Sequence, residues 1–512
     1  MNFQFKEYTN SKGEIILYLG EPNLEQLAKV SLEYGDVWHS SLDQGYKNTF
    51  PEIINQTPTF WYINDFENLD ICVNWRINPN LFAVRKTVWE TIGGFETDYS
   101  SIQMMALDYG YNGLCYKGIT PLYVKSLFEN NIENFKIPLV DKYGFFIKNF
   151  KIEHAKYMLF RNGILNPNHW IAYFKAKKQF KLKTQEKLFP PRELNKIEGN
   201  PTVSYIIPTM LRQDFTLTLL NDLVNQSYLV SQVVVVDATP LHKRDASLYK
   251  SNNYPFEVVF KWQESKGSCR ARNEAIDLCT GEYIIFGDDD VRLPNNFVEN
   301  HIRLLQTYNA VACNGLDIRA DNMKQNLQDL EEKLKLVDSK RWKVGVTNSF
   351  SNANSCVKKT YVDLLVGNDI NYDGGYGEDS DFGISLNKIG AAVLHNPFSV
   401  NLHLKPPTGG YRFWGLQAKV TGKKRKKQPW EMDFPVKNIV PVPSPTITYQ
   451  VLKQFNKVQL KEFKIKYFVN QIVRGSIFQL PYRLVKLPYR ILQFNKSIFY
   501  AKKLIKLGKR TK

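Results

Sequence analysis

Gly281-Glu-Tyr-Ile-Ile-Phe-Gly-Asp-Asp-Asp-Val-Arg-Leu-Pro294 is the stretch that decides the fold. Its apolar residues 283–286 predict a buried strand, and Pro294 limits that strand because proline is not tolerated in a central strand. Three successive aspartates, 288–290, lie between them. Clustered carboxylates repel one another unless a cation neutralises them, and oxygen ligands favour Mg²⁺ or Mn²⁺. A solvated acidic turn is the alternative that these residues alone leave open.

Strands and helices alternate upstream of this stretch. Residues 203–207, 232–236 and 256–260 predict strands, and residues 215–224 and 268–278 predict helices. This rhythm is typical of a parallel sheet with crossover helices. Polar residues follow each predicted strand, namely Thr209 and Arg212, then Asp237, then Lys266, then the aspartates. Because open α/β sheets bind ligands at the carboxyl ends of their strands, we expect these residues to line one site.

The length of the chain predicts more than one domain. Its 512 residues are too many for a single core, and its 43% hydrophobic content is typical of globular proteins. Residues 189–201 contain prolines, a glycine and several charged residues, a composition that predicts a linker. We therefore expect an N-terminal α/β domain over residues 1–190, a catalytic domain over residues 200–415 and a basic helical tail over residues 416–512.

Six cysteines without CxxC spacing argue against a disulfide framework or a zinc site and favour a reduced compartment. The first residues lack the basic start and apolar core of a secretory signal. No apolar run approaches the roughly 18 residues that a membrane-spanning helix needs. We therefore expect a cytoplasmic chain, either soluble or peripheral to the inner face of the cell membrane.

The formal net charge of +18 is concentrated near the C-terminus. Residues 461–512 contain fourteen Lys and Arg residues and a single acid, Glu462, and Gly422-Lys-Lys-Arg-Lys-Lys427 adds a further basic run. Aromatic and aliphatic residues alternate with these bases at near-helical spacing, and Pro481 and Pro488 predict breaks into short helices. The pattern favours an anionic membrane surface as partner. A solvated helical tail is the second reading, and nucleic acid is the least favoured partner.

If the tail is such an anchor, removing the residues after about 455 should release the chain from membranes. We expect the catalytic part to survive that deletion.

Five ordered motifs resemble those of the family 2 glycosyltransferases with the GT-A fold. They are the opening stretch, Ile206-Ile-Pro-Thr-Met-Leu-Arg212, Val233-Val-Val-Val-Asp237, Lys266-Gly-Ser-Cys-Arg-Ala-Arg-Asn273 and Gly374-Gly-Tyr-Gly-Glu-Asp-Ser-Asp-Phe-Gly383. The likeness covers roughly residues 200–405, and motifs in order are more specific than any one alone. It implies an α/β fold of the GT-A class, with a Rossmann-like mixed sheet, and a glycosyltransferase activity.

The resemblance also implies roles for individual residues. A nucleotide-sugar donor, such as a UDP- or GDP-sugar, would contact Pro208, Thr209, Arg212, Asp237, Lys266, Arg272, Asp288 and Asp289. Asp288 and Asp290 match the two acidic positions of the Asp-x-Asp motif, and with His403 they are the implied ligands of Mn²⁺ or Mg²⁺. A lone histidine is more often structural than a ligand, so both readings of His403 stay open.

Asp379 is the implied catalytic base, with Glu378 beside it. A carboxylate activates a sugar hydroxyl by accepting its proton, and a divalent cation stabilises the charge of the departing nucleoside diphosphate. One base opposite one leaving group predicts inversion at the anomeric carbon, and the sequence shows no obvious second carboxylate for a double displacement. Taken alone, the Glu378-Asp379 pair also fits the acidic first turn of a helix.

These observations predict a metal-dependent, inverting glycosyltransferase of surface polysaccharide or glycolipid biosynthesis. Its acceptor would be a glycan or a lipid-linked sugar. The alternatives are a non-catalytic glycan- or nucleotide-binding homologue, a nucleotidyltransferase and a nucleic-acid-binding protein. The sequence leaves open whether the chain forms a homo-oligomer.

Two further segments bear on this reading. Lys405-Pro-Pro-Thr-Gly-Gly-Tyr-Arg-Phe-Trp414 has the glycines of a lid and the aromatics of a sugar-contacting surface, although an ordinary loop fits equally well. Residues 80–95 run parallel to residues 354–368, but the acidic segment Gly377-Glu-Asp-Ser-Asp381 has no counterpart in Tyr99-Ser-Ser-Ile-Gln-Met-Met105. We predict a degenerate, non-catalytic glycosyltransferase-like half in residues 1–190, for acceptor binding or dimerisation. Chance similarity is the alternative.

Overall fold

The computed structural model describes residues 3–40, 50–64, 66, 68–129, 135–183, 187–250, 253–406, 409–411 and 430–512. The basic run 422–427 lies outside the described residues, as do positions 407, 408 and 412–414 of the predicted lid. The chain forms two compact units. The first comprises Met1–Arg192, Trp342–Thr347 and Lys457–Phe463, and the second comprises Glu193–Arg341, Asn348–Asn456 and Lys464–Lys512. The three-part division expected from the sequence stays a prediction.

The first unit contains a mixed sheet with strand order β1-β2-β5-β3-β6-β4 in the described residues. Its strands are β1 (Lys6–Thr9), β2 (Ile15–Leu19), β3 (Val37–His39), β4 (Ile71–Val73), β5 (Phe82–Arg85) and β6 (Pro121–Val124). Its helices are α1 (Leu24–Val30), α3 (Glu52–Gln56), α4 (Lys86–Ile92), α5 (Ile102–Asn112), α6 (Leu139–Asn149), α7 (Ile152–Asn162) and α8 (Pro167–Gln179).

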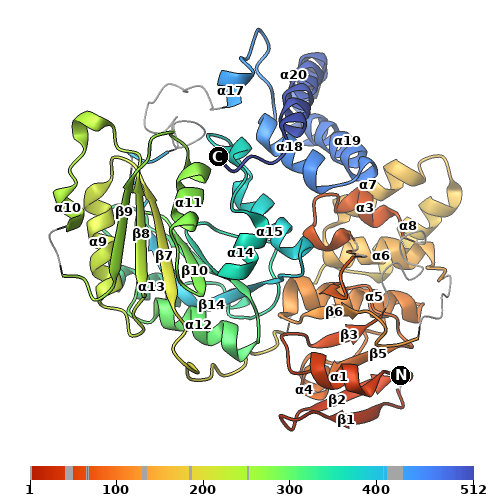
Figure 1. Ribbon diagram of the computed structural model, residues 1–512. Helices are drawn as coiled ribbons and strands as arrows, with labels where there is room; N and C mark the ends of the chain where they lie inside the picture. Colours follow the sequence, from red (N-terminus) through yellow and green to blue (C-terminus); the bar gives the residue numbers. More distant parts are fainter. Residues whose placement is uncertain are drawn as a thin grey trace. The chain divides into compact units, whose positions relative to one another are not determined.

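The second unit holds the larger sheet, with order β11-β14-β12-β13-β10-β7-β8-β9 among the described residues (Figure 1). Its strands are β7 (Val203–Thr209), β8 (Gln232–Asp237), β9 (Glu257–Trp262), β10 (Tyr283–Gly287), β11 (Val291–Arg292), β12 (Ala312–Arg319), β13 (Asn354–Lys358) and β14 (Val393–His403). Its helices before β14 are α9 (Gln213–Val224), α10 (Ser247–Lys250), α11 (Ser268–Asp277), α12 (Phe297–Thr307), α13 (Leu327–Lys335), α14 (Lys359–Leu365) and α15 (Glu378–Lys388).

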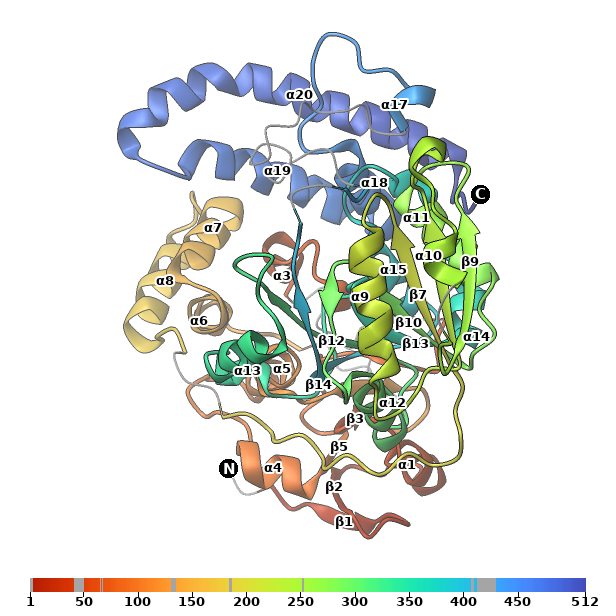
Figure 2. The same ribbon diagram turned by 90° about the vertical axis from the view of Figure 1, so that its left-hand side faces the viewer.

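Three strands of the parallel half of this sheet, β7, β8 and β10, were predictable because they are buried on both faces. Strands β10, β7, β8 and β9 pair in parallel, and every residue of β7, β8 and β10 is buried. Crossover helices cover the faces of such a sheet, and Figure 2 shows α9 in front of the strands. Strand β13 pairs antiparallel with both β10 and β12, so the sheet is mixed, as predicted.

The two sheets share a topology. In the first unit β2, β5, β3 and β6 are adjacent, and in the second β10, β13, β12 and β14 are adjacent in the same order. The pairings also agree, because in each set the first two contacts are antiparallel and the last is parallel. The helices that follow correspond as well, since α4 directly follows β5 as α14 directly follows β13. The repeated segment noticed in the sequence is therefore repeated in structure.

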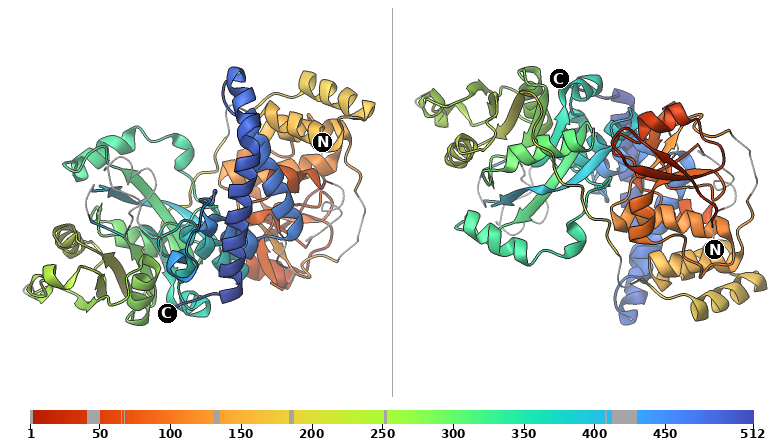
Figure 3. Two further views of the ribbon diagram at one scale, coloured as in Figure 1. Left: turned by 90° about the horizontal axis from the view of Figure 1, so that it is seen from above. Right: turned by 90° about the horizontal axis from the view of Figure 1, so that it is seen from below.

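The C-terminal region of the second unit is helical, as predicted, with a single long helix at its end. Its helices are α17 (Trp430–Asp433), α18 (Pro445–Gln454), α19 (Lys457–Val473) and α20 (Leu480–Leu507), of which α19 is divided between the two units. The prediction of a break at Pro488 is wrong, because α20 continues through it (Figure 3). Pro488 has no N–H to donate to the carbonyl of Leu484 one turn earlier. Leu484 is exposed to solvent, so water can take the place of that donor.

This region also belongs to the core of the second unit. Tyr500, Ala501 and Leu504 of α20 pack with Tyr449 of α18 and with Ile370, all of them buried. The expectation that the catalytic part survives deletion of the residues after about 455 treated those residues as a separate tail. They are part of this core instead, and their removal would open it. No helix among the described residues is long and apolar enough to cross a membrane.

Candidate active site

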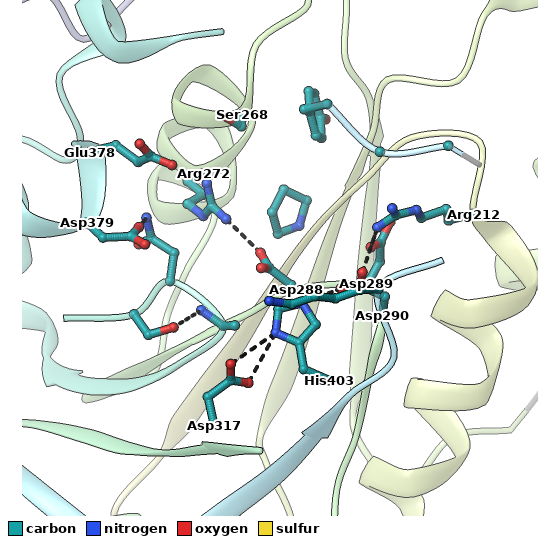
Figure 4. Close-up of a pocket in the computed structure, with 18 of the residues that line it drawn as sticks. Arg212, Ser268, Arg272, Asp288, Asp289, Asp290, Asp317, Glu378, Asp379 and His403 are labelled. Atoms are coloured by element: carbon teal, nitrogen blue, oxygen red, sulfur yellow. Dashed lines mark hydrogen bonds and ion pairs between the residues drawn. The ribbon is translucent and has the colours of Figure 1, made fainter. Parts of the chain in front are cut away.

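A cavity of about 260 Å³ lies within the second unit, at the carboxyl ends of β7 and β10. The three aspartates after β10 form one wall, and Glu378 and Asp379 at the start of α15 face them (Figure 4). Arg272 of α11 points in between these two groups. Of the residues that the sequence places at the strand ends, Arg212 and the three aspartates line this cavity.

The three aspartates have different sets of partners, although Asp289 and Asp290 share Arg212. Asp288 accepts a hydrogen bond from Arg272 Nη2 at 2.7 Å. Asp289 accepts from Thr209 Oγ1 at 2.8 Å and from Arg212 Nη1 at 3.0 Å. Burial raises the pKa of Asp289, and the neighbouring Asp290 carboxylate raises it further. Asp289 thus ties the β10 turn to the β7 turn, a structural task beside its predicted donor contact.

Asp290 lies between Arg212 and His403. Its carboxylate accepts from Arg212 Nη1 at 2.9 Å and lies 3.2 Å from His403 Nε2. Burial alone would raise the pKa of Asp290, but hydrogen bonding to His403 and the charges of His403 and Arg212 keep it below its usual value. For His403 burial acts in the opposite direction and lowers the pKa. Asp290 and Asp317 on its two sides outweigh this effect and raise the pKa of His403 to about 10. The two carboxylates therefore favour the protonated form of His403.

The donor set at this place suits a divalent cation. Asp288, Asp290 and His403 each offer one ligand atom, and these atoms lie within 4.8 Å of one another. Two carboxylate oxygens and an imidazole nitrogen are a combination that Mn²⁺ accepts and that also suits Mg²⁺ through its oxygens. A bound cation would take over the positive charge that a protonated His403 supplies to these carboxylates. Binding would release the Nε2 proton of His403.

The acidic pair opposite is placed by a helix start. Gly377, with a φ of +103°, allows the sharp turn into α15, whose first residues are Glu378 and Asp379. The N-terminus of a helix carries partial positive charge, which stabilises carboxylates there. Asn352, just before β13, donates a hydrogen bond to Asp379 Oδ1 and fixes its orientation. Asp379 lies beside Glu378 in the pocket wall in Figure 4.

Asp373 holds the first turn of α11, the helix that carries Arg272. The Asp373 carboxylate accepts from the Cys269 N–H at 2.7 Å and from Arg270 Nη1 at 3.1 Å, so it caps the first turn of α11. A side chain at Gly267 would meet Asp373 Oδ2 at 2.2 Å, which explains the glycine. The buried Nε of Arg272 has no hydrogen-bond partner in the described residues. An unpaired buried donor in a pocket wall suits an anionic ligand.

Part of the predicted lid is described. Gly410 N–H donates to Met210 O at 2.7 Å, and the Tyr411 hydroxyl donates to Thr209 O at 3.1 Å. Gly409 and Gly410 have φ values of +71° and +74°. A Cβ at Gly409 would lie 2.6 Å from Arg212 Cγ, so only glycine lets the segment pass this close. Residues 409–411 therefore lie over the Arg212 side of the pocket.

Most, but not all, predicted site residues line the cavity. Pro208, Arg212, Arg272, Asp288, Asp289, Asp290, Glu378, Asp379 and His403 do so. Three predicted donor-binding residues are outside this lining set, which covers the described residues. Thr209 is fully buried beneath Asp289, Asp237 is fully buried against Tyr249, and Lys266 is exposed. Their predicted roles, like those of the lining residues, stay predictions.

Sequence reasoning missed several lining residues, among them Asp317 and Asn352. Asp317 lies near the end of β12, a strand that carried no recognised motif. A polar residue at a strand end was the available signal, since the same signal identified Asp237. Asn352 belongs to a turn before β13, where asparagine is common for local reasons.

Residues 204–362 match the model of the family "Glycosyl transferase family 2". This part of the chain is a family 2 glycosyltransferase domain. With the mixed sheet of the second unit, the match confirms the predicted GT-A class of α/β fold. It spans β7 to α14 and includes the three aspartates of the pocket wall.

Two curated proteins of Escherichia coli (strain K12) are similar to this chain. One is named as a colanic acid biosynthesis glycosyl transferase, WcaA, and is 30% identical over 101 residues, which are 19% of this chain and 36% of WcaA. The other is an uncharacterized glycosyltransferase, YibD, 29% identical over 89 residues, which are 17% of this chain and 26% of YibD. The chain therefore spans about a third or less of the length of these relatives.

The solved structures to which part of this chain is similar include a mannosyltransferase, PcManGT, from Pyrobaculum calidifontis in complex with GDP-Man and Mn²⁺. It is 19% identical, with a TM-score of 0.33, covering 61% of this chain and 89% of that one. Residues 1–349 of S. aureus TarS are 12% identical, with a TM-score of 0.34, covering 61% of this chain and 93% of that one.

Proposed function

We propose that the protein transfers a sugar from a nucleotide-sugar donor to a hydroxyl of a glycan or lipid-linked acceptor, with inversion and with a divalent cation. The observation that carries the proposal is the two-sided pocket. One side gathers Asp288, Asp290 and His403 within ligand distance, and the other presents Asp379 at a helix start. Arg272 lies in the wall beside both.

The residues of this chain divide the reaction between them. Asp379 accepts the proton of the acceptor hydroxyl while that oxygen attacks the anomeric carbon and the bond to the diphosphate oxygen breaks. Asn352 keeps the Asp379 carboxylate in one orientation during this step. Arg272, with its unpaired Nε, meets the negative charge of the departing diphosphate. A bound Mn²⁺ or Mg²⁺ would stabilise the same charge as a Lewis acid.

The activity is tested with a donor screen in the presence of Mn²⁺, read as the release of a nucleoside diphosphate. We expect release from one UDP- or GDP-sugar, and a fall of about a hundredfold to ten-thousandfold in Asp379→Asn while donor still binds. Asp321→Asn is the matched control, because Asp321 is an exposed acid of the same unit outside the pocket. Unchanged turnover in Asp379→Asn would remove the proposed base.

Release of pyrophosphate instead of nucleoside diphosphate would identify a nucleotidyltransferase. Donor binding without turnover in the wild type would identify a non-catalytic homologue.

Surface polysaccharide or glycolipid synthesis is the proposed setting. The similarity to a protein named for colanic acid biosynthesis supports it over the matched 101 residues. A lipid-linked acceptor would require the pocket to work near a bilayer, on the cytoplasmic side where nucleotide sugars are the donors. We propose that the basic C-terminal helical region holds the protein at the bilayer.

Helix α20 carries an exposed apolar stripe in its first half. Tyr482, Val485, Tyr489 and Leu492 recur at helical spacing, and each is about half exposed or more. Arg483, Lys486 and Arg490 flank the stripe, and residues 463–512 contain no acid. Each basic residue near an anionic bilayer contributes about 1 kcal/mol of binding free energy. We propose that this stripe binds the anionic inner face of the cell membrane.

Vesicle sedimentation tests the stripe without truncating the chain. The wild type should sediment with vesicles of phosphatidylglycerol and phosphatidylcholine, and Val485→Glu with Tyr489→Glu should not. Leu336→Glu is the matched control, since Leu336 is 86% exposed in the same unit, away from α20. Sedimentation of the double variant equal to that of the control would refute the membrane role.

The first unit is proposed to be a degenerate copy of the acceptor-side half of the domain. The shared strand order supports this reading. The start of α5, which corresponds to the start of α15, is closed by the protein itself, because Asp141 accepts from the Ser100 and Ser101 N–H groups. A helix start already bound to an internal carboxylate has no place for a catalytic one. Acceptor binding or dimerisation are the proposed roles.

A further inference from the structure

We propose that Asp317 is a positioning residue of the cation site, which keeps a proton on Nδ1 of His403 and so presents Nε2 to the cation. The inference rests on the proposed function only in that the pocket takes a divalent cation. Its evidence is the hydrogen bonding of the described residues around His403.

The two nitrogens of His403 face different carboxylates. Nδ1 lies 3.1 Å from Asp317 Oδ1 and 3.2 Å from Oδ2, whereas Nε2 lies 3.2 Å from Asp290 Oδ1 (Figure 4). Asp290 is one of the three grouped ligand residues and Asp317 is not. The Asp317 side therefore fixes the ring, and the Asp290 side is the one directed at the cation. In metalloproteins the outer nitrogen of a ligating histidine commonly donates to such a carboxylate.

Strand register places Asp317 at this position. Asp317 of β12 is paired directly with Asn401 of β14, and His403 follows two residues later on the same face. The alternate residues Val400, Leu402 and Leu404 face a separate apolar cluster. The polar face and the apolar face of β14 are thus segregated by the two-residue period of the strand.

Asp317 is itself held by a buried polar chain. Asn401 Nδ2 donates to Asp317 Oδ1 at 2.7 Å, and Asn354 Nδ2 donates to Asn401 Oδ1 at 2.7 Å. Asn354 Oδ1 in turn lies 2.9 Å from His301 Nε2. Asn354, Asn401 and His301 are fully buried. A fully connected buried network rigidifies the groups at its end, here the carboxylate that orients His403.

The experiment measures the metal alone, on the full chain without donor. Mn²⁺ affinity is titrated by electron paramagnetic resonance for the wild type, Asp317→Ala, Asp317→Asn and the control Asp321→Asn. Asp317→Ala should weaken Mn²⁺ binding about 10- to 100-fold, the usual effect of losing such a partner. Asp317→Asn should weaken it less, because an amide oxygen at the Oδ1 position still accepts from both Asn401 and His403. Asp321→Asn should bind as the wild type does.

A second readout reports the tautomer directly. In histidine-labelled protein with Mg²⁺, nitrogen-15 shifts of His403, assigned with His403→Gln, should show a protonated Nδ1 in the wild type. The signal should change in Asp317→Ala, and thermal unfolding checks that each variant is folded. If the alanine variant does not fold, Asp317→Asn and the wild-type spectrum decide the matter.

Wild-type affinity in Asp317→Ala, a protonated Nε2 in the metal-bound wild type, or no Mn²⁺ binding at all would each overturn the inference. Failure of the proposed function looks different. In that case no donor is turned over, while Mn²⁺ binding still depends on Asp317.

Discussion

Truncation after Leu507 should destabilise the second unit, although it removes only a short C-terminal strap, residues 508–512. The strap lies along the segment that precedes the acidic pair. Ile370 N–H donates to Arg510 O at 2.8 Å, Asn371 Nδ2 donates to Gly508 O at 2.7 Å, and Lys509 Nζ donates to Gly367 O at 2.8 Å. Further bonds join Arg510 to Asn371, Arg510 to Asp369, and Thr511 to Asn273.

The magnitude follows from these bonds. A net contribution of about 1 kcal/mol for each hydrogen bond gives a loss on the order of 5 kcal/mol in the free energy of unfolding. Ile370 and Asn371 are buried, so their donors would have to find water instead. At about 2–4 °C per kcal/mol, that loss converts to a fall of about 10–20 °C in the unfolding temperature.

Scanning calorimetry of the full chain measures the effect, with deletion of the exposed Lys512 alone as the control. Donor affinity should fall as well, because the strapped segment continues to Asp373, which caps the helix of Arg272. If the chain ending at Leu507 unfolds at the same temperature as the control, the strap contributes nothing and this reasoning fails.

Three other perturbations test separate parts of the site. Asp290→Asn should abolish Mn²⁺-dependent transfer, and activity within a factor of ten of the wild type would contradict its place among the ligands. Gly409→Val should raise KM for the donor, because its side chain would displace Arg212 from Asp289 and Asp290; an unchanged KM would argue against contact between this segment and the donor side. Urea should unfold the protein more easily as the pH falls from 6.5 towards 3. Burial lowers the pKa of His301 to about 3, so only the unfolded chain takes up a proton in that window and stability present above pH 6.5 is lost. His301→Gln should flatten this dependence, and equal slopes would refute the assignment.

The parts of the fold that followed from sequence are those with local causes. Strands β7, β8 and β10 were predictable because buried parallel strands need uninterrupted apolar runs. The position of Asp288 and Asp290 in the pocket wall was predictable because they directly follow a buried strand, and such sheets bind ligands at the carboxyl ends of their strands. The repeat was visible because its two copies keep the same strand and helix pattern.

The parts that did not follow depend on distant pairing. Asp317 acquires its role from the register between β12 and β14, which no local pattern fixes. The docking of Tyr500 and Leu504 against Tyr449 joins segments about fifty residues apart, and its signal was hidden among basic residues. The prediction of a helix break at Pro488 was wrong because proline destabilises a helix less where the carbonyl that lost its N–H donor can bind water.

Helix α20 also fixes the distance between its exposed apolar stripe and its buried part. Its exposed stripe around Val485 and its buried anchor at Ala501 are sixteen residues apart on one continuous helix, a rise of about 24 Å. If the stripe lies flat on lipid, this helix acts as a spacer that fixes how far its own anchor lies, along the membrane plane, from the attached turns. Inserting or deleting whole turns between the two would change that lateral distance while keeping both faces in phase. Only acceptors whose reacting hydroxyl lies within reach at that distance would then be used.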